Sequence, residues 1–332
     1  MTTATRRNFL ALTMLGIAST AVACGTAGGA PTKTLRYQGS AGTVTLPELA
    51  ADLGFLGDVK LDWVGNTTSG PQDIQSAATG QTDVGGAFNG AVVKLAAAGA
   101  PIKAVIGYYG SDQVSNVGYY VLEDSPIRTA RDLIGKKVGM NTLGAHYEAV
   151  LDIYLQRNGF SAADSKQVEP LVVPPLNTEQ ALRQKQIDVA ALSSVYQDKA
   201  LANGGIRPLF TDVALLGPFT AGSLVLTNSF IQRNPDTVRT FVTGVARAIE
   251  WSKSTPRDQV LARMTDIVHQ RGRNEDTSAL KYWKSFGVSQ PGGRISDADL
   301  SRWADWLAQR GDIQQVKVAD IYTNQYNDLA GK

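Results

Sequence analysis

The chain has 332 residues, of which 43% are hydrophobic and 19% charged, enough for two ordinary domains of a soluble globular protein. Lys and Arg total 32 and Asp and Glu total 30, and two of the basic residues, Arg6 and Arg7, lie near the N-terminus. The remaining chain is formally neutral, which argues against a nucleic-acid partner, since that needs a basic face. The single cysteine, Cys24, excludes an intrachain disulfide, and two histidines alone cannot form a metal site. No metal and no cofactor are expected.

Residues 1–23 are predicted to be a secretory signal peptide. Arg6 and Arg7 precede an apolar run over 9–23, which is too short to span a bilayer comfortably. Arg6-Arg7 followed by Phe9-Leu10 resembles a twin-arginine export signal. The alternative is an uncleaved membrane anchor.

The end of this segment predicts a lipid anchor. Ala21-Val22-Ala23-Cys24 resembles a bacterial lipobox, with Ala21 where leucine is usual. In a lipobox the cysteine is lipidated and becomes the new N-terminus, so Cys24 is the predicted lipidation site. Residues 24–32 are rich in glycine and predict a flexible tether. The protein is therefore expected on the extracytoplasmic side of the cell membrane, where no ATP pool would serve a kinase.

The first part of the chain alternates strand and helix signals. Thr45 to Glu48 form a capping box with proline at the first helical position, and Gly54 ends that helix. Ser69-Gly70-Pro71 opens the next helix, and Gly80 closes it. Strands are expected at 35–37, 59–63, 83–87 and 102–107, with a third helix at 91–98. This alternation predicts a mainly parallel sheet.

Ligands bind beyond the carboxyl ends of strands in such sheets. That rule places five residues near one rim: Ser40, Phe88, Asn89, Tyr108 and Tyr109. Each has an ordinary alternative, with Ser40 as a turn residue and the tyrosines as half-buried packing.

Residues 136–159 carry the central hypothesis. A strand at 137–140 turns through 141–144 and becomes an amphipathic helix that stops at Asn158-Gly159. The start of a helix leaves backbone N–H groups unpaired and carries the positive end of the dipole. The turn is therefore expected to hold the acidic head of a small ligand. The alternative is an ordinary connection in which Asn141 or Thr142 caps the helix.

The second part of the chain repeats the first. Residues 80–85 have a counterpart in 185–190, and each is expected to lead into a polar loop, at 88–90 and 193–196. Two similar α/β lobes are predicted, with a small-ligand cleft between them. The first lobe is assigned residues 33–118 and 223–332, and the second lobe residues 119–222.

A hinge is expected where the chain passes between the lobes. A strand at 221–226 is predicted to pair in the opposite direction with a strand at 117–122, and such crossing strands permit closure around a ligand. Helices follow from Pro235, at 256–269 and at 296–309. Trp303 and Trp306 lie at helical spacing, which favours core packing over the alternative of ligand stacking.

This layout resembles the substrate-binding proteins of ABC importers, in the aliphatic-sulfonate, taurine and nitrate group. Four stretches carry the likeness, at 125–138, 141–147, 188–196 and 234–251. His146 stands where sulfonate binders often have histidine. Ser193 and Ser194 depart from the tryptophan and aspartate common in the pocket loop, and Asn141-Thr142-Leu143 replaces a serine run.

The resemblance implies a two-lobed α/β fold of the type II periplasmic-binding class, with mainly parallel sheets flanked by helices and a two-strand hinge. It implies capture of a small organic oxyanion, an aliphatic sulfonate or taurine-like molecule, and delivery to a permease with its ATPase. The protein is expected to be a monomer and not an enzyme. The expected ligand residues are Ser40, Phe88, Asn89, Tyr109, Asn141, Thr142, His146, Ser193 and Tyr196.

Several alternatives remain open at this stage. The ligand could be nitrate, bicarbonate or a thiamine-precursor pyrimidine, since the family includes binders of these molecules. An enzyme of the pyrimidine-synthase type is disfavoured because the chain lacks the cysteine-rich iron motif of that chemistry. A sensor domain that presents ligand to a receptor has the same sequence signals as an importer component. His146 could be a structural cap.

Overall fold

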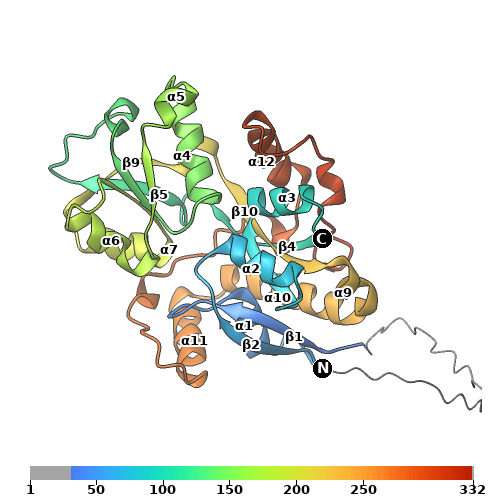
Figure 1. Ribbon diagram of the computed structural model, residues 1–332. Helices are drawn as coiled ribbons and strands as arrows, with labels where there is room; N and C mark the ends of the chain where they lie inside the picture. The colour runs from blue at the N-terminus through green and yellow to red at the C-terminus, as the bar shows by residue number, and fades with distance from the viewer. Residues whose placement is uncertain (1–30, 331–332) are drawn as a thin grey trace, which may run out of the picture. The chain divides into compact units, whose positions relative to one another are not determined.

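The computed structural model describes residues 31–330, so the predicted signal peptide, Cys24 and nearly all of the tether lie outside the described residues. Within this range no helix combines the length and apolar character needed to cross a bilayer. Figure 1 shows the elements from the middle of the chain gathered together, in green, apart from the blue and orange-red elements of its two ends.

The first elements begin and end where local signals predict. Thr45 caps the first helix in a capping box with Glu48, and Gly54 follows its end with φ of 72°. Gly80 adopts the same left-handed region after the second helix. These elements are β1 (Thr34–Gly39), α1 (Leu46–Asp52), β2 (Lys60–Asn66), α2 (Gly70–Ala78), β3 (Val84–Phe88), α3 (Asn89–Ala97) and β4 (Ile102–Ser111).

The core sheet of this part includes a strand from much later in the chain. β10 (Phe219–Thr227) lies between β3 and β4 and is antiparallel to both. β1 and β2 form a separate parallel pair. We use lobe 1 for the elements around these two sheets.

The middle of the chain forms a five-stranded sheet, whose surrounding elements we name lobe 2. The strand order is β7-β6-β8-β5-β9, with β6 parallel to β7 and β8, and β5 antiparallel to β8 and β9. The elements are β5 (Val117–Leu122), β6 (Lys137–Met140), α4 (His146–Arg157), α5 (Ala162–Ser165), β7 (Glu169–Val172), α6 (Pro175–Arg183), β8 (Val189–Ser193), α7 (Ser194–Ala202), β9 (Ile206–Thr211) and α8 (Asp212–Leu216).

The predicted strand pair at the hinge is wrong. β5 bonds to β8 and β9, and β10 bonds to β3 and β4, so both edges of each strand are already taken. The chain crosses between the lobes at 112–116 and 212–218, and the flanking strand ends pair instead, Ser111 with Phe219 and Gly118 with Thr211. The expectation of mainly parallel sheets is also wrong. β1 and β2 are parallel, the β3-β10-β4 sheet has only antiparallel pairs, and the five-stranded sheet is mixed. The residue boundaries assigned to the two lobes stay a prediction.

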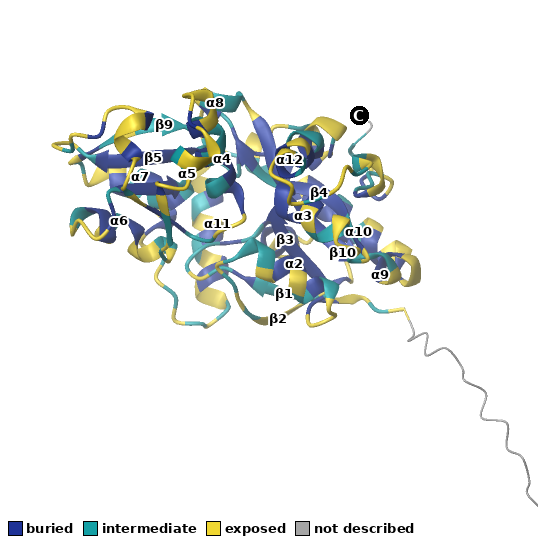
Figure 2. Ribbon diagram, turned by 45° about the horizontal axis from the view of Figure 1, so that its top comes forward, coloured by how far each residue is buried: buried dark blue, intermediate teal, exposed yellow. Residues whose placement is uncertain are grey.

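Helices of the C-terminal part pack against lobe 1. α10 lies against α1, and α12 lies against α3. Trp303 and Trp306 of α12 are buried, 1% and 5% exposed, so the prediction of core packing is confirmed. Figure 2 shows β3, β4, β5 and β10 mostly buried and the outer helix faces exposed. These helices are α9 (Asn228–Arg233), α10 (Pro235–Ser254), α11 (Arg257–Gln270) and α12 (Asp297–Gln309), with short 3₁₀ turns at Ala130–Leu133, Leu280–Tyr282, Pro291–Gly293 and Val318–Asp320.

Candidate functional site

A cavity of about 470 Å³ lies between the two lobes. Its walls include the last residues of β3 and the residues that follow β1 and β2 in lobe 1, and the residues that follow β6, β7 and β8 in lobe 2. This is the position expected for ligands of α/β sheets, and the volume suits a small organic molecule. Most of the surrounding side chains are apolar, aromatic or hydroxyl-bearing.

Six helices begin at the wall of this cavity, and two of them offer few free donors, because Thr45 caps α1 in a capping box and α6 begins at Pro174 and Pro175. The N-cap residues of the other four also line the cavity, and within residues 31–330 none of these four receives a side-chain cap. Uncapped helix starts present backbone N–H groups and positive dipole ends, which favour an anion. α2 and α3 come from lobe 1 and α4 and α7 from lobe 2, with N-caps Ser69, Phe88, Ala145 and Ser193.

The start of α7 is also strained. Ser194 has φ of 50°, a left-handed conformation that is uncommon for a residue other than glycine. Strained backbone of this kind persists where the surrounding structure holds it, often at binding sites. The expected polar loops at 88–90 and 193–196 are not loops, because β3 and β8 run directly into α3 and α7.

Eight of the nine ligand residues expected from the sequence line the cavity. The exception is Asn89, which is absent from the wall and fully buried. Its amide nitrogen donates to the carbonyl oxygens of Thr220 and Asp299, and its Oδ1 accepts from Ser223. Asn89 therefore ties β10 and α12 to α3, and its expected ligand role is wrong. The eight are Ser40, Phe88, Tyr109, Asn141, Thr142, His146, Ser193 and Tyr196, with Tyr108 beside them.

His146 opens α4 and is only 4% exposed. Its ring stacks on Phe88, with centroids 5.4 Å apart and planes 9° apart. Nε2 lies 3.1 Å from Oδ2 of Asp212, yet neither ring nitrogen meets hydrogen-bond geometry with any described residue. His146 and Asp212 are thus close without a well-formed hydrogen bond, and both ring nitrogens retain hydrogen-bonding capacity.

Polar contacts already join the two lobes across the cavity. Asn141 Nδ2 donates to the carbonyl oxygen of Thr68 at 3.2 Å, and the hydroxyls of Ser69 and Thr142 lie 3.3 Å apart. Farther out, Lys284 pairs with Asp198 at 2.6 Å. The two lobes are therefore in direct contact in this structure.

Several residues of the cavity wall were not among those expected from the sequence. Asp73 and Gly86 lie inside segments that read as plain helix and strand, and Trp283 and Phe286 lie in a stretch without periodicity. Among the wall residues that were not expected, only Ser69 carries a local sequence signal that could have placed it at the cavity, because Ser69-Gly70-Pro71 marks the start of a helix. Among the described residues, no group of three or more His, Cys, Asp or Glu side chains could hold a metal.

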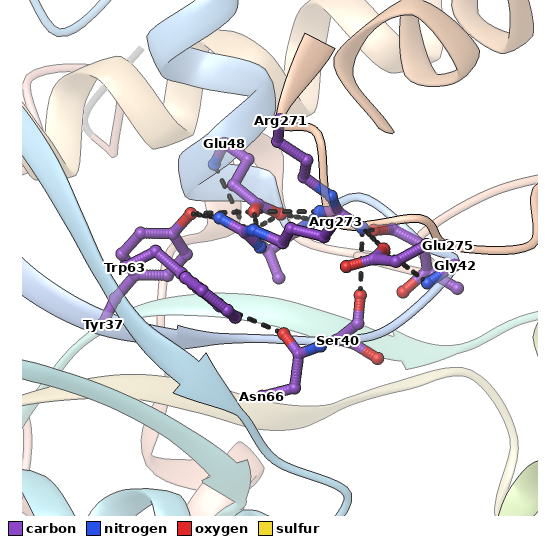
Figure 3. Close-up of polar contacts among 11 residues, drawn as sticks. Tyr37, Ser40, Gly42, Glu48, Trp63, Asn66, Arg271, Arg273 and Glu275 are labelled. Atoms are coloured by element: carbon purple, nitrogen blue, oxygen red, sulfur yellow. Dashed lines mark hydrogen bonds and ion pairs between the residues drawn. The ribbon is translucent and has the colours of Figure 1, made fainter. Parts of the chain in front are cut away.

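A buried network of two arginines and two glutamates holds the loop after β1 at the edge of the cavity. Figure 3 shows Arg271 and Arg273 converging with Glu48 and Glu275. Arg271 bonds to both glutamates, and its Nη2 donates to the carbonyl oxygens of Ser40 and Thr43.

Other contacts complete this network. Glu275 accepts from the backbone N–H of Gly42, and Arg273 stacks over Trp63 at 3.8 Å. Tyr37 donates to Glu48, and burial together with that carboxylate raises the pKa of Tyr37 to about 12. The position of Ser40 in the wall thus depends on residues more than two hundred positions away.

Replacing Arg271 by Leu should lower the free energy of unfolding by about 3 kcal/mol, because two buried carboxylates lose their main partner. Urea unfolding followed by circular dichroism measures this. Arg263→Leu is the matched control, since Arg263 pairs with Asp52 at the surface and should cost less than about 1 kcal/mol. Equal losses in the two variants would contradict the assigned role of Arg271.

Comparison with known proteins agrees with this architecture. The family model described as NMT1/THI5 like matches residues 49–259, more than half of the chain. A putative aliphatic sulfonates-binding protein of Escherichia coli is 28% identical over 218 residues, which span 64% of this chain and 66% of that protein.

Solved structures show the same fold. The alkanesulfonate-binding protein SsuA from Xanthomonas axonopodis pv. citri, bound to MOPS, superposes with a TM-score of 0.69 at 22% identity, covering 89% of this chain and 100% of that one. The desulfurization enzyme DSZB also matches, with a TM-score of 0.58 at 15% identity over 88% and 97% of the two chains. The chain belongs to the NMT1/THI5-like family and has the two-lobed α/β fold of its sulfonate-binding relatives.

Proposed function

We propose that this protein captures a small organic oxyanion, an aliphatic sulfonate or a taurine-like molecule, between its lobes and delivers it to the permease of an ABC importer. The observation that carries the proposal is the meeting of four uncapped helix starts, from both lobes, in one cavity. Their N–H groups would bind the oxyanion, and the aromatic wall would pack against its organic part.

The composition of the wall favours a singly charged oxyanion over a phosphate. No Lys or Arg is found among the described lining residues, so the charge would be balanced by helix dipoles, hydroxyls and His146. Helix dipoles supply partial charges, which suit a monoanion better than a dianion. Phe88, Tyr109 and Tyr196 would surround the apolar part of the ligand.

The hydrogen bonds between the two lobes indicate how the ligand would be captured and released. Thr68 and Ser69 of lobe 1 bond directly to Asn141 and Thr142 of lobe 2, beside the start of α4. These few hydrogen bonds are weak enough to break on opening, and a bound anion would add contacts to both sides. Closure would therefore be favoured by ligand, and opening at the permease would release it.

The location of the protein is part of this proposal. Solved structures with this fold include a periplasmic aliphatic sulphonate binding protein of Escherichia coli and a periplasmic nitrate-binding protein of Synechocystis PCC 6803. Export through a twin-arginine signal and lipidation at Cys24 would hold the protein on the extracytoplasmic face of the membrane, as a monomer beside its permease.

Thermal unfolding with added ligands tests the proposal. The full chain carrying Cys24→Ser, which cannot be lipidated, should unfold at higher temperature with millimolar alkanesulfonates, because a ligand of the folded state stabilises it by mass action. Nitrate, bicarbonate and an aminopyrimidine are the comparison ligands. Stabilisation by the pyrimidine alone would overturn the oxyanion assignment, and turnover of any ligand would overturn the assignment as a binding protein.

A further inference from the structure

One acidic residue interrupts the otherwise uncharged wall of the cavity. Asp73, in the first turn of α2, is the only Asp, Glu, Lys or Arg among the lining residues that the structure describes. It is 8% exposed. A lone buried carboxyl in a site suited to anions is unexpected, since it opposes the charge that the four helix starts favour.

The carboxyl is held in place by the strand beneath it. Gly86 of β3 donates its N–H to Oδ2 of Asp73 at 2.7 Å. Gly85 permits this approach, because a Cβ at that position would lie 2.5 Å from the carbonyl oxygen of Asp73. The ring of Tyr108, from β4, lies over Gly86 on the other side. Asp73 thus lies between α2 and β3, and none of the Lys, Arg or His side chains that the structure describes pairs with it.

One of the two oxygens of the Asp73 carboxyl has no hydrogen-bond partner among the described residues. Oδ1 of Asp73 makes no hydrogen bond to any described residue, although it is buried. Buried polar atoms are nearly always paired, and an exception at a binding site points to a group that the ligand satisfies. Burial raises the pKa of Asp73 from 3.8 to about 7, against the opposing effect of the Gly86 hydrogen bond, so the carboxyl is poised to gain or lose its proton near neutrality.

We propose that Asp73 is a subsite for a protonated amine of the ligand, so that the captured molecule is a zwitterion with an ammonium group as well as its anionic head. The inference rests on the proposed function, because the helix starts hold the anionic end while Asp73 pairs with the ammonium. Oδ1 itself is covered, so a ligand nitrogen reaches the carboxyl as the side chain turns about its Cβ–Cγ bond. Such a carboxylate would discriminate against ligands that lack the amine, because a buried charge would then stay unpaired.

Calorimetric titration with matched ligand pairs tests this subsite. Each aminoalkanesulfonate of two, three and four carbons is compared with the alkanesulfonate of the same length, using the full chain with Cys24→Ser. At least one amino compound should bind 10-fold or more tightly than its partner. In Asp73→Asn, which keeps the shape and the acceptor for Gly86, that preference should disappear, with the alkanesulfonate affinity within threefold of wild type.

Asp266→Asn is the control, because it makes the same change of charge on the exposed face of α11. It should leave both affinities unchanged. If the wild type binds both members of every pair equally, or if Asp73→Asn keeps the preference, the subsite is overturned while the proposed function stands. Absence of any sulfonate binding by the wild type would overturn both.

The pH dependence of the free energy of unfolding tests the protonation state of the Asp73 carboxyl in the absence of ligand. Because the folded state holds the proton of Asp73 more tightly than the unfolded state, this group should lower the free energy of unfolding as pH rises from 3.8 to about 7. In Asp73→Asn that part of the pH slope should be lost, and the variant should be at least as stable as wild type at pH 8. A variant less stable than wild type at pH 8 would show instead that the charged carboxyl stabilises the unliganded fold, which overturns the subsite.

Discussion

Replacing Ser193 by Asp should abolish capture of an alkanesulfonate while leaving the fold intact. Ser193 is the N-cap of α7, lines the cavity and makes no side-chain cap. An aspartate at an N-cap accepts hydrogen bonds from the first turn, so its carboxylate would occupy the donors proposed for the ligand. Its charge would also repel the oxyanion. We expect affinity to fall at least 100-fold, about 2.7 kcal/mol, measured by calorimetry.

Stability separates this effect from misfolding. Capping should offset the loss of the 2.5 Å contact between the Ser193 and Tyr147 hydroxyls, so the melting temperature should stay within a few degrees of wild type. Ser193→Asn caps α7 without charge and should cost a smaller share of affinity. Ser161→Asp changes the N-cap of exposed α5 in the same lobe and should have no effect. Wild-type affinity in Ser193→Asp would exclude the start of α7 from the ligand site.

Removing the carboxylate of Asp212 should lower stability as much as replacing Arg271 by Leu. Asp212 is fully buried where the chain crosses between lobes. It accepts from the backbone N–H of Val117 at 3.0 Å and from the Ser111 hydroxyl, and it lies beside His146. Asp212→Ala leaves these groups unpaired and should lower the free energy of unfolding by about 3 kcal/mol.

The same variant should loosen the connection between lobes. Hydrogen exchange at 112–117 should become faster, since the amide of Val117 loses its acceptor. Asp212→Asn retains an acceptor for that amide and should lose about half as much stability. Asp328→Ala removes an exposed pair with Arg239 and should cost less than about 1 kcal/mol. If Asp212→Ala is as mild as this control, Asp212 does not secure the crossing.

Local signals predicted most of the helices and strands. A helix start or stop can be inferred from a few adjacent residues, because these residues act on neighbouring backbone groups. The examples here are Thr45 with Glu48, Ser69-Gly70-Pro71 and Asn158-Gly159. Eight of the nine expected ligand residues line one cavity. The rule that ligands bind beyond strand ends supplied Ser40, Phe88 and Tyr109, and the helix-start argument and the family resemblance supplied the others. Ser40 and Tyr196 are far apart in sequence and still meet there.

Contacts between distant segments were not predictable in this way. The pairing of 117–122 with 221–226 failed because periodicity shows that a strand exists and not which edge it joins. Asn89 was misplaced for a related reason. A polar residue after a strand can face the ligand or bond inward, and the outcome depends on β10 and α12, whose sequences lie far away.

The sequence by itself determined the two α/β lobes, the helix starts at Ser69-Gly70-Pro71 and after the turn at 141–144, and the resemblance to sulfonate binders. Each depends on periodicity or on residues next to one another in the chain. Only the tertiary structure decided that β10 enters the first sheet, that Arg271 holds the loop of Ser40 and that Asp73 lies unpaired in the wall. Burial and pairing of a side chain are fixed by the residues that pack against it, and those residues can lie more than two hundred positions away.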